Sequence, residues 1–206
     1  MSEKTVEFRG VDDLYIAEII QDDADGYETG APELLSDFAE ISKTVESGKA
    51  TKFYNNKAKI TIKSEGADVI AIAVPVLALN KLSKVTGKYF DEATGAFIDC
   101  ERSNKQYALG YRMKKTDGTW RYVWRLKGDF TTIPDETAAT EDDGTDSNGQ
   151  ALEYSGVYTN HVFTKGGADG KGGAAKGVVA DSDGKTDVSG WFTSVQTPDT
   201  VKAKTA

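Results

Sequence analysis

The chain has 206 residues, and its 33 acidic and 25 basic residues give a formal net charge of −8. This length is enough for one large β domain with a buried core, and we expect a single domain over residues 1–206. The net negative charge argues against a protein that binds nucleic acid through its phosphates, because such binding requires clustered Lys and Arg. A single cysteine, Cys100, excludes a disulfide framework and a site of paired thiols.

The sequence shows no targeting or membrane-spanning segment. Its first residues lack the apolar core of a signal peptide, and its longest apolar run, residues 69–79, is too short to span a bilayer and is interrupted by Pro75. A lone thiol also fits assembly in a reducing cytoplasm. We therefore expect a soluble protein that does not contact a membrane.

The first third of the chain predicts strands separated by polar turns. Residues 6–8 and 14–20 favour strands broken near Gly10, and residues 21–32 form a polar loop rich in turn-forming residues. Residues 34–45 alternate weakly and predict a strand that leads into Ser47-Gly48. Residues 58–63 alternate clearly, and residues 69–74 continue as apolar strand sequence rich in β-branched residues.

A helical rhythm begins at Pro75. Apolar residues recur at helical spacing over residues 76–85, and Thr86-Gly87 offers a C-terminal stop. Proline is tolerated in a first helical turn because its missing N–H is not needed there. The pattern predicts a helix from Pro75 to Val85 that covers one end or face of the sheet, followed by a turn and a strand over residues 90–98.

The segment from Tyr107 to Phe130 predicts a long β-hairpin. Its residues alternate with period two on both sides of Asp117-Gly118, a dipeptide favoured in two-residue hairpin turns. The second strand has one face with Trp120, Tyr122, Trp124 and Leu126, and another with Arg121, Val123, Arg125 and Lys127. Since Trp, Tyr and Arg dominate buried interface anchors, this strand is a candidate for a subunit contact.

The aromatic and basic residues over 120–125 leave two interpretations open. They could stack on single-stranded bases. They could instead belong to a half-buried strand whose arginines meet acidic residues of a neighbouring strand or subunit. The net charge of −8 favours the second interpretation.

The last third of the chain is predicted to be rich in loops. Residues 134–149 are polar and acidic, with no basic residue, and predict a long loop. Residues 151–164 return to strand composition, whereas residues 165–177 are a Gly/Ala/Lys-rich loop without predicted regular structure. An apolar island at 190–195 precedes a polar tail at 196–206. The whole pattern predicts a mainly β fold of two packed antiparallel sheets with one flanking α-helix and long loops.

No pattern in the sequence indicates an active site. His161, the only histidine, lies within a strand pattern without a nucleophile motif, which favours a structural or surface role. Cys100 has acidic neighbours, which do not activate a thiol. The acidic residues after Asp22 do not match a calcium loop, and residues 166–173 lack the Gly-Lys-Ser/Thr of a phosphate loop. We therefore expect no enzyme activity, cofactor or metal site.

Three stretches carry a resemblance to a known family. They are residues 10–17 with 25–34, residues 108–112 with 117–130, and the closing Trp-Phe-Thr-Ser-Val at 191–195. In these stretches the chain resembles the major tail tube proteins of phages with long, non-contractile tails (the siphovirus type), particularly phages of Gram-positive bacteria. The predicted helix also falls where that family has one, whereas the acidic loop and the Gly/Ala/Lys-rich loop depart from its pattern.

The resemblance implies a barrel-like fold of two packed β-sheets and a purely structural function. Six subunits would close into a ring, and rings would stack into the tail tube through which DNA passes into the host without specific binding. The implied partners are further copies of the chain, the tape measure protein, the tail terminator and the baseplate hub. The implied localisation is the tail of the virion, after assembly in the host cytoplasm.

The candidate interface residues follow from the strand pattern and the resemblance. Contacts within a ring are assigned to Trp120, Arg121, Tyr122, Trp124, Arg125 and Lys127. Contacts between rings are assigned to the loop at 22–31 and the segment at 135–149, with Asp22, Asp23, Asp25, Tyr27, Asp135, Glu141 and Asp142. The alternative is an Ig-like or carbohydrate-binding β-sandwich on a phage or cell surface, in which exposed Trp120 and Trp124 stack on sugar rings.

Overall fold

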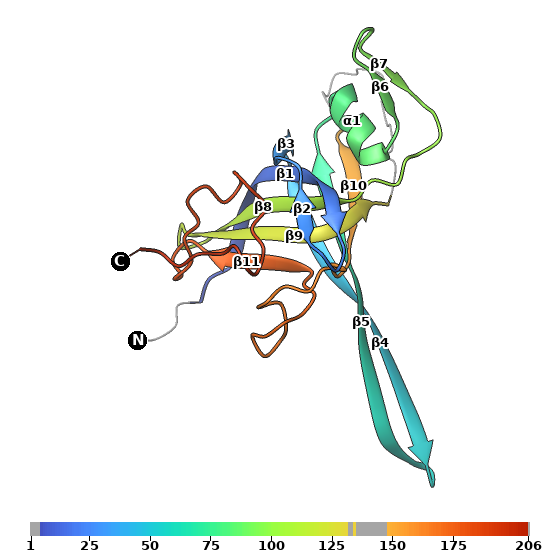
Figure 1. Cartoon of the computed structure of the whole chain (residues 1–206), viewed down its shortest axis with the longest axis vertical. Helices are drawn as coiled ribbons and strands as arrows, with labels where there is room; N and C mark the ends of the chain where they lie inside the picture. Colours follow the sequence, from blue (N-terminus) through green and yellow to red (C-terminus); the bar gives the residue numbers. More distant parts are fainter. Residues whose placement is uncertain (1–4, 132–133, 135–147, 206) are drawn as a thin grey trace, which may run out of the picture.

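The computed structural model describes residues 5–131, 134 and 148–205, and over these residues the chain is mainly β (Figure 1). A large antiparallel sheet, a small second sheet and a helix confirm the predicted fold class. The large sheet contains β1 (Phe8–Asp22), β2 (Tyr27–Thr29), β3 (Glu33–Ser36), β4 (Glu40–Tyr54), β5 (Lys57–Val74), β8 (Tyr107–Lys115), β9 (Trp120–Phe130), β10 (Gln150–Gly156) and β11 (Gly177–Asp181). The small sheet pairs β6 (Tyr89–Asp91) with β7 (Ala96–Ile98), and the helix α1 spans Leu79–Thr86.

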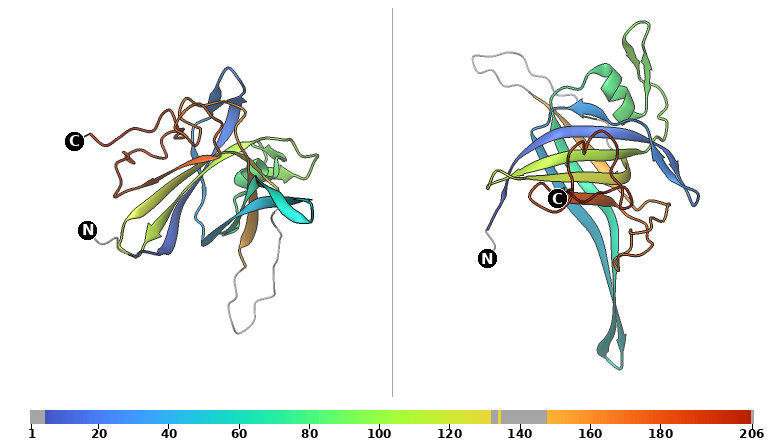
Figure 2. Two further views of the ribbon diagram at one scale, coloured as in Figure 1. Left: turned by 90° about the horizontal axis from the view of Figure 1, so that it is seen from below. Right: turned by 60° about the vertical axis from the view of Figure 1, so that its left-hand side comes forward.

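The large sheet curls so that its two halves enclose one core. Its strands follow the order β2-β1-β8-β9-β10-β5-β4, with β3 added to β1 and β11 added to β9. Strand β9 pairs with β11 along its first half and with β10 near its end. Leu14 and Ile16 of β1 therefore share one buried cluster with Ile70 and Ile72 of β5. Figures 1 and 2 show the two halves crossing each other around this core.

The predicted hairpin forms as β8 and β9, joined at Asp117-Gly118. Gly118 adopts a φ of 89°, and Asp117 Oδ1 accepts a hydrogen bond from the N–H of Thr119 at 3.0 Å. Trp124 stands opposite Gly110 of β8 in the register, and a Cβ at Gly110 would lie 2.8 Å from the indole ring. Glycine at position 110 therefore allows the tryptophan to pack across the neighbouring strand.

A second buried cluster covers the other face of β9. Trp124 is fully buried there, and its Nε1 donates a hydrogen bond to the carbonyl oxygen of Trp191 at 3.0 Å. Phe163 and Val195 belong to the same cluster. The predicted apolar island at 190–195 thus serves to cover this face of the sheet.

The helix is shorter than predicted because the residues before it stay extended. Ala78, with a φ of −60° and a ψ of 144°, precedes α1, so Pro75 lies outside the helix and not in its first turn. The end agrees with the prediction: Gly87 has a φ of 69°, and the N–H groups of Gly87 and Lys88 donate to carbonyls of the last turn. Helix α1 contacts β6, β7 and β9 and forms a small lobe with the two-stranded sheet.

The structure corrects two of the predicted N-terminal strands. β1 is one continuous strand with Gly10 paired inside it, so the predicted break is only a shift in register with β8 between Phe8 and Gly10. A second shift lies beside Asp13, which has a φ of 59°. Residues 34–45 divide between β3 and the start of β4. The predicted strand end near Gly48 is wrong, because Gly48 pairs with Ser64 in the middle of a hairpin.

The sequence pattern predicts residues 40–45, 58–63 and 69–74 of the long hairpin that β4 and β5 form, but not its length or its turn. Its turn is Asn55-Asn56, with φ values of 52° and 59°. Positive φ at both central residues is the geometry of a two-residue type I′ turn, and Asn is one of the few residues besides Gly that adopts it. The Asn-Asn pair is therefore the sequence signal for this hairpin.

The C-terminal third has more structure than its composition predicts. Strand β10 ends at Gly156, so the strand expected to reach residue 164 is wrong beyond that point. In the Gly/Ala/Lys-rich segment, Ala175 and Lys176 are buried and Gly173 forms a β-bridge with Phe163. This segment leads directly into β11, a strand that the sequence pattern does not predict.

Candidate assembly surface

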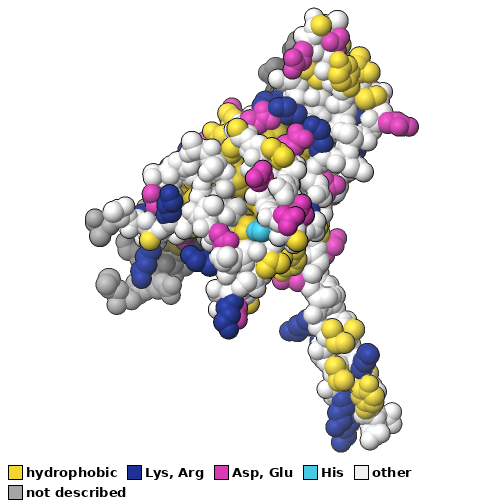
Figure 3. Space-filling view, in the orientation of Figure 1, with side chains coloured by type: hydrophobic (Ala, Val, Ile, Leu, Met, Phe, Trp, Pro, Cys, Tyr) yellow, Lys and Arg dark blue, Asp and Glu magenta, His cyan; other side chains and the backbone are white. Residues whose placement is uncertain are grey.

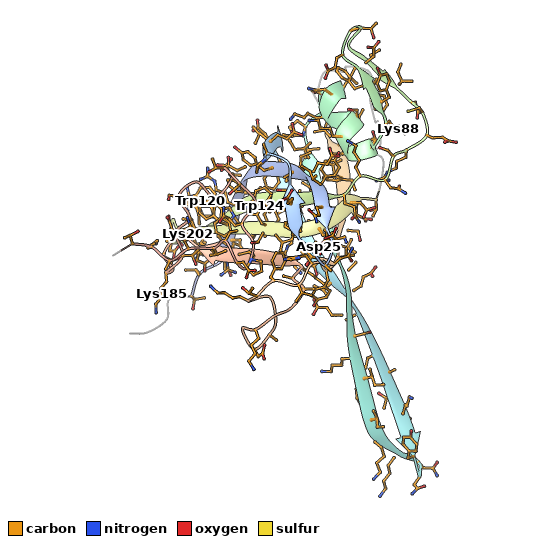
Figure 4. All side chains as sticks on the ribbon, in the orientation of Figure 1. Asp25, Lys88, Trp120, Trp124, Lys185 and Lys202 are labelled. Atoms are coloured by element: carbon orange, nitrogen blue, oxygen red, sulfur yellow. The ribbon has the colours of Figure 1, made fainter. Side chains whose placement is uncertain are left out.

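The aromatic strand β9 belongs to the folded core, which corrects the proposed exposure of Trp124. Trp124 is fully buried by its own chain and is unavailable to a neighbouring subunit or a sugar ring. Trp120 is half-buried, and the guanidinium carbon of Arg112 lies 4.4 Å from its ring centroid. Tyr122 is also half-buried and packs against Trp191. Figure 4 shows both labelled tryptophans on the body of the molecule.

The arginines of β9 pair with carboxylates of neighbouring segments in the same chain. Arg121 makes two hydrogen bonds to Asp181 of β11, at 2.7 and 2.8 Å. Arg125 Nη1 lies 3.3 Å from the carboxylate of Asp68 in β5. These contacts confirm the interpretation of a half-buried strand whose arginines meet acidic neighbours. They also leave the arginines poorly placed to bind a nucleic acid.

An ion pair between Lys127 and Asp22 is buried at the end of β1. Their side chains are 8% and 5% exposed, and Lys127 Nζ lies 2.6 Å from the carboxylate of Asp22. Burial acts to raise the pKa of Asp22, but hydrogen bonds from the N–H of Asn160, from Lys127 and from the N–H of His161 outweigh it and lower the pKa. Asp22 is thus an internal anchor for the segment after β10, which corrects its assignment to an inter-ring contact.

The remaining residues of the predicted inter-ring loop divide between surface and interior. Asp23 and Asp25 are exposed, and Asp23 closes the turn by accepting hydrogen bonds from the N–H groups of Asp25 and Gly26 at 2.8 and 3.1 Å. Tyr27 is half-buried, its hydroxyl donates to the carbonyl oxygen of Leu126, and burial raises its pKa. The other three assigned residues, Asp135, Glu141 and Asp142, lie outside the described residues.

A projecting hairpin is the main surface feature that the sequence pattern does not predict. We call residues 44–66, the outer part of the β4–β5 hairpin, the arm. Almost all of its residues are exposed, and it leaves the body as a two-stranded ribbon (Figures 1 and 2). Among the described strands, β4 is the last in the sheet order, so within this part of the chain the arm also presents an unpaired strand edge. The lobe of α1, β6 and β7 projects from the opposite end of the molecule.

The arm is basic and partly apolar although the chain as a whole is acidic. Residues 47–64 contain five lysines and no acidic residue, so the rest of the chain has 20 basic and 33 acidic residues and a net charge of −13. Phe53 is 66% exposed, and Tyr54, Ile60 and Ile62 are exposed as well. Figure 3 shows apolar and basic side chains together along the ribbon.

The arm lacks contacts that would stabilise it by itself. A two-stranded hairpin without a covered face is marginally stable at best in water. Lys49 and Lys63 stand directly opposite each other in the register, where like charges repel. Ala50 and Ile62 are paired on the other face and are exposed too. These properties are typical of a surface that a partner covers.

The base of the arm is fixed by a charge cluster around Asp68. This aspartate of β5 is 1% exposed, and its carboxylate lies 3.2 Å from Lys43, 3.3 Å from Arg125 and 3.3 Å from Lys176. Lys176 also donates to Glu65 at 2.8 Å. Burial acts to lower the pKa of Lys176, but Glu65 and Asp68 outweigh it and raise the pKa. The cluster ties the arm to β9 and gives the Gly/Ala/Lys-rich segment a structural role.

Two of the concave surfaces on the body are lined mainly by apolar or aromatic side chains. An apolar groove of about 810 Å³ lies at the opposite end of the β4–β5 hairpin from its turn, and it is lined by Phe38, Ala39, Val74, Pro75, Val76 and Ala151. A depression of about 380 Å³ is lined by Tyr15, Arg112, Tyr122, Trp191 and Phe192. Trp191 Nε1 is buried beside this depression and has no hydrogen-bond partner among the described residues.

Reactive groups are sparse in the part of the chain that the structure describes. Within that part, no three His, Cys, Asp or Glu side chains are grouped to hold a metal ion. Cys100 is exposed after β7, and His161 contributes its backbone N–H to Asp22. Over the same residues, no helix has the length and apolar character needed to cross a membrane.

Comparison with known proteins gives no family for this chain. No protein-family model matches the sequence, and no curated protein matches it either.

Proposed function

We propose that this chain is a structural subunit that assembles with copies of itself into stacked rings through its arm, and so forms the tail tube of a long, non-contractile phage tail. The observation that carries the proposal is the arm, an exposed, basic and partly apolar ribbon on an otherwise acidic chain. Another copy of the chain offers the opposite charge. A tube of identical subunits brings arms and bodies together in a regular way.

The arm supports head-to-tail association. It would meet a surface unlike itself, so the contact is heterologous, and heterologous contacts form rings when the rotation closes and filaments when it does not. Either arrangement covers the unpaired edge of β4, which otherwise invites uncontrolled strand pairing. Hexameric rings, taken from the family resemblance, complete the proposal.

The charge distribution supports passage of DNA without binding. The lysines of the arm are the concentrated positive charge of the chain, and contacts between copies would cover them. The remaining net charge of −13 would then repel the phosphates of a passing genome. In this proposal the chain has no catalytic role, resides in the virion, and meets the tape measure protein, the tail terminator and the baseplate hub.

Assembly of the purified protein tests the proposal. Light scattering and negative-stain microscopy should show monomers at low concentration and rings or tubes as the concentration rises. A variant in which Asn-Gly joins Ser47 to Glu65, which are paired in the register, lacks most of the arm and should remain monomeric, while the near-ultraviolet circular dichroism of buried Trp124 stays unchanged. A full-length protein that never assembles, alone or with tail partners, would contradict the proposal.

The aromatic depression favours a second candidate function, carbohydrate binding. Its lining includes Tyr15, Tyr122 and Phe192, and the guanidinium of Arg112 adds a polar group. Aromatic walls with a few polar groups are typical of small-molecule sites. Retention on a glycan affinity gel that Tyr122→Ala abolishes, with assembly unchanged, would favour this function. Trp124→Ala is unsuitable for the test because Trp124 is buried.

A further inference from the structure

The apolar groove on the body has features that complement the end of the arm. We call this groove the socket. It has a volume of about 810 Å³, and Phe38, Val74 and Val76 contribute to its apolar lining. Two exposed carboxylates stand at its edge: Asp37 lines the groove, and Glu40 pairs with Ala73, another lining residue.

The end of the arm presents the matching chemistry. We call residues 52–57, on both sides of the Asn55-Asn56 turn, the tip. Phe53 and Tyr54 are its exposed apolar side chains, and Lys52 and Lys57 flank them. The tip is therefore apolar with a positive border, whereas the socket is apolar with a negative border.

The tip cannot enter the socket of its own chain. Both lie at the ends of one hairpin, whose register runs from Glu40 opposite Ala73 to Tyr54 opposite Lys57. At about 3.3 Å per residue, the length of β4 separates them by roughly 50 Å. Figure 1 shows the turn and the other end of the hairpin far apart. Complementary surfaces at opposite ends of one element can pair only between molecules, and such pairing continues from copy to copy.

We propose that the tip of one copy docks into the socket of a second copy, with Phe53 and Tyr54 in the groove and Lys52 and Lys57 at the acidic edge. This inference rests on the proposed function, since both require contact between copies. A second copy is the favoured occupant because one chain carries both complementary halves. The two aromatic side chains bury less area than a standard interface, so one such contact is weak. The tube must therefore be stabilised by many of these contacts acting at the same time.

Cross-linking between defined positions tests the docking. In a Cys100→Ser background, molecules with Ala58→Cys beside the tip are mixed with molecules with Ala39→Cys in the socket, and a short bismaleimide is added to assembled protein. Both alanines are small, and both are exposed. We expect a mixed dimer, and a ladder of multimers when one chain carries both substitutions. Ala24→Cys, an exposed site on the β1–β2 turn, is the matched control and should give no mixed dimer with Ala58→Cys.

The outcomes separate the docking from the proposed function. Tubes that form without the cross-link between positions 39 and 58 would overturn the docking and leave the tube function standing. In assembled tubes, a cross-link within one molecule between Ala39→Cys and Thr140→Cys would show that the chain fills its own groove, and it would also overturn the docking. Protein that neither assembles nor cross-links would overturn both proposals.

Charge reversal gives a second measurement. Lys52→Glu with Lys57→Glu should raise the critical concentration for assembly by about tenfold, because the tip would then repel the acidic edge. Adding Asp37→Lys and Glu40→Lys to the same chain should restore assembly. Lys49→Glu with Lys63→Glu makes the same change in net charge outside the tip, and the socket substitutions should not rescue it. Failure of the tip variant to be rescued would contradict docking at this socket.

Discussion

Two buried aspartates hold the projecting segments of this molecule to its body. Asp68 meets cations of β4, β9 and the Gly/Ala/Lys-rich segment at the base of the arm. Asp22 meets Lys127 and the backbone of the segment that follows β10. A buried charge is costly when it loses its partner, so removing one member of such a pair destabilises a fold strongly. These carboxylates therefore set where the arm and the C-terminal segments leave the sheet.

Acid should weaken the fold in part through Asp22. Burial acts to raise its pKa, but hydrogen bonds from Asn160, Lys127 and His161 lower it below its ordinary value. An unfolded Asp has a pKa of about 3.9, so the unfolded chain takes up this proton first as the pH falls. The stabilisation is complete above about pH 4 and is lost as the pH falls through the lower folded value. Urea unfolding over this acid range should show a decreasing free energy of unfolding.

Asp22→Asn is the variant that isolates this carboxylate. It leaves the buried Lys127 without its counter-charge, and we expect a loss of about 3 kcal/mol in the free energy of unfolding at neutral pH. The free energy of unfolding of this variant should also decrease less than that of the wild type as the pH falls. Asp25→Asn, an exposed substitution in the same turn, should change neither property. An undiminished acid dependence in Asp22→Asn would assign the effect to other carboxylates.

At the scale of single residues, charge was easier to predict than burial. The net charge of −8 was enough to predict that the arginines of β9 meet carboxylates, as Arg121 meets Asp181. The exposure of Trp124 could not be predicted from its strand, because its cover comes from Trp191, which lies 67 positions further along the chain. Local alternation reports which residues share a face, but it cannot report that a distant segment covers that face.

At the scale of elements, the dependence on local alternation explains why the first strand of the arm is not predicted, although residues 58–63 of its second strand are. Alternation marks a strand that is buried on one face, and most of the arm is exposed on both faces, so residues 44–57 show no clear pattern. Signals that act locally gave correct predictions: Asp117-Gly118 marked the β8–β9 turn, and Gly87 marked the end of α1. The turn at Asn55-Asn56 is a signal of the same local kind.

Lys63→Glu should have opposite effects on the free arm and on assembly. It replaces repulsion between Lys49 and Lys63 with attraction, a cross-strand change of about 0.2–1 kcal/mol, so amides of the arm should exchange more slowly in the monomer. It also lowers the charge of residues 47–64 from +5 to +3, so assembly should weaken. Hydrogen exchange and light scattering measure the two effects.

Lys59→Glu is the matched control for this element. It makes the same change in net charge, but Lys59 lies at the irregularity between β4 and β5 and has no opposed lysine in the register. It should weaken assembly without slowing exchange in the arm. Slower exchange in both variants would mean that net charge, and not the opposed pair, governs the stability of the arm.

At the scale of the whole molecule, the hairpin limits how far apart contacting copies can lie. If the tip of one copy occupies the socket of the next, equivalent points in the two copies are separated by roughly the length of β4, about 50 Å. The rise from ring to ring can equal this distance only if the hairpin runs parallel to the tube axis, and any tilt makes the rise smaller. The hairpin thus sets an upper limit on the axial repeat of the proposed tube.

Salt should oppose assembly if the arms meet acidic bodies of neighbouring copies. The Debye length falls from about 10 Å at 0.1 M salt to about 3 Å at 1 M, so NaCl screens this attraction and leaves the apolar contacts in place. We expect the critical concentration measured by light scattering to rise between these two conditions. Lys52→Gln with Lys57→Gln should assemble poorly in both and show a smaller salt dependence. Assembly that NaCl promotes would instead mean that repulsion between acidic bodies, each with a net charge of −13 outside residues 47–64, outweighs the attraction of the arms.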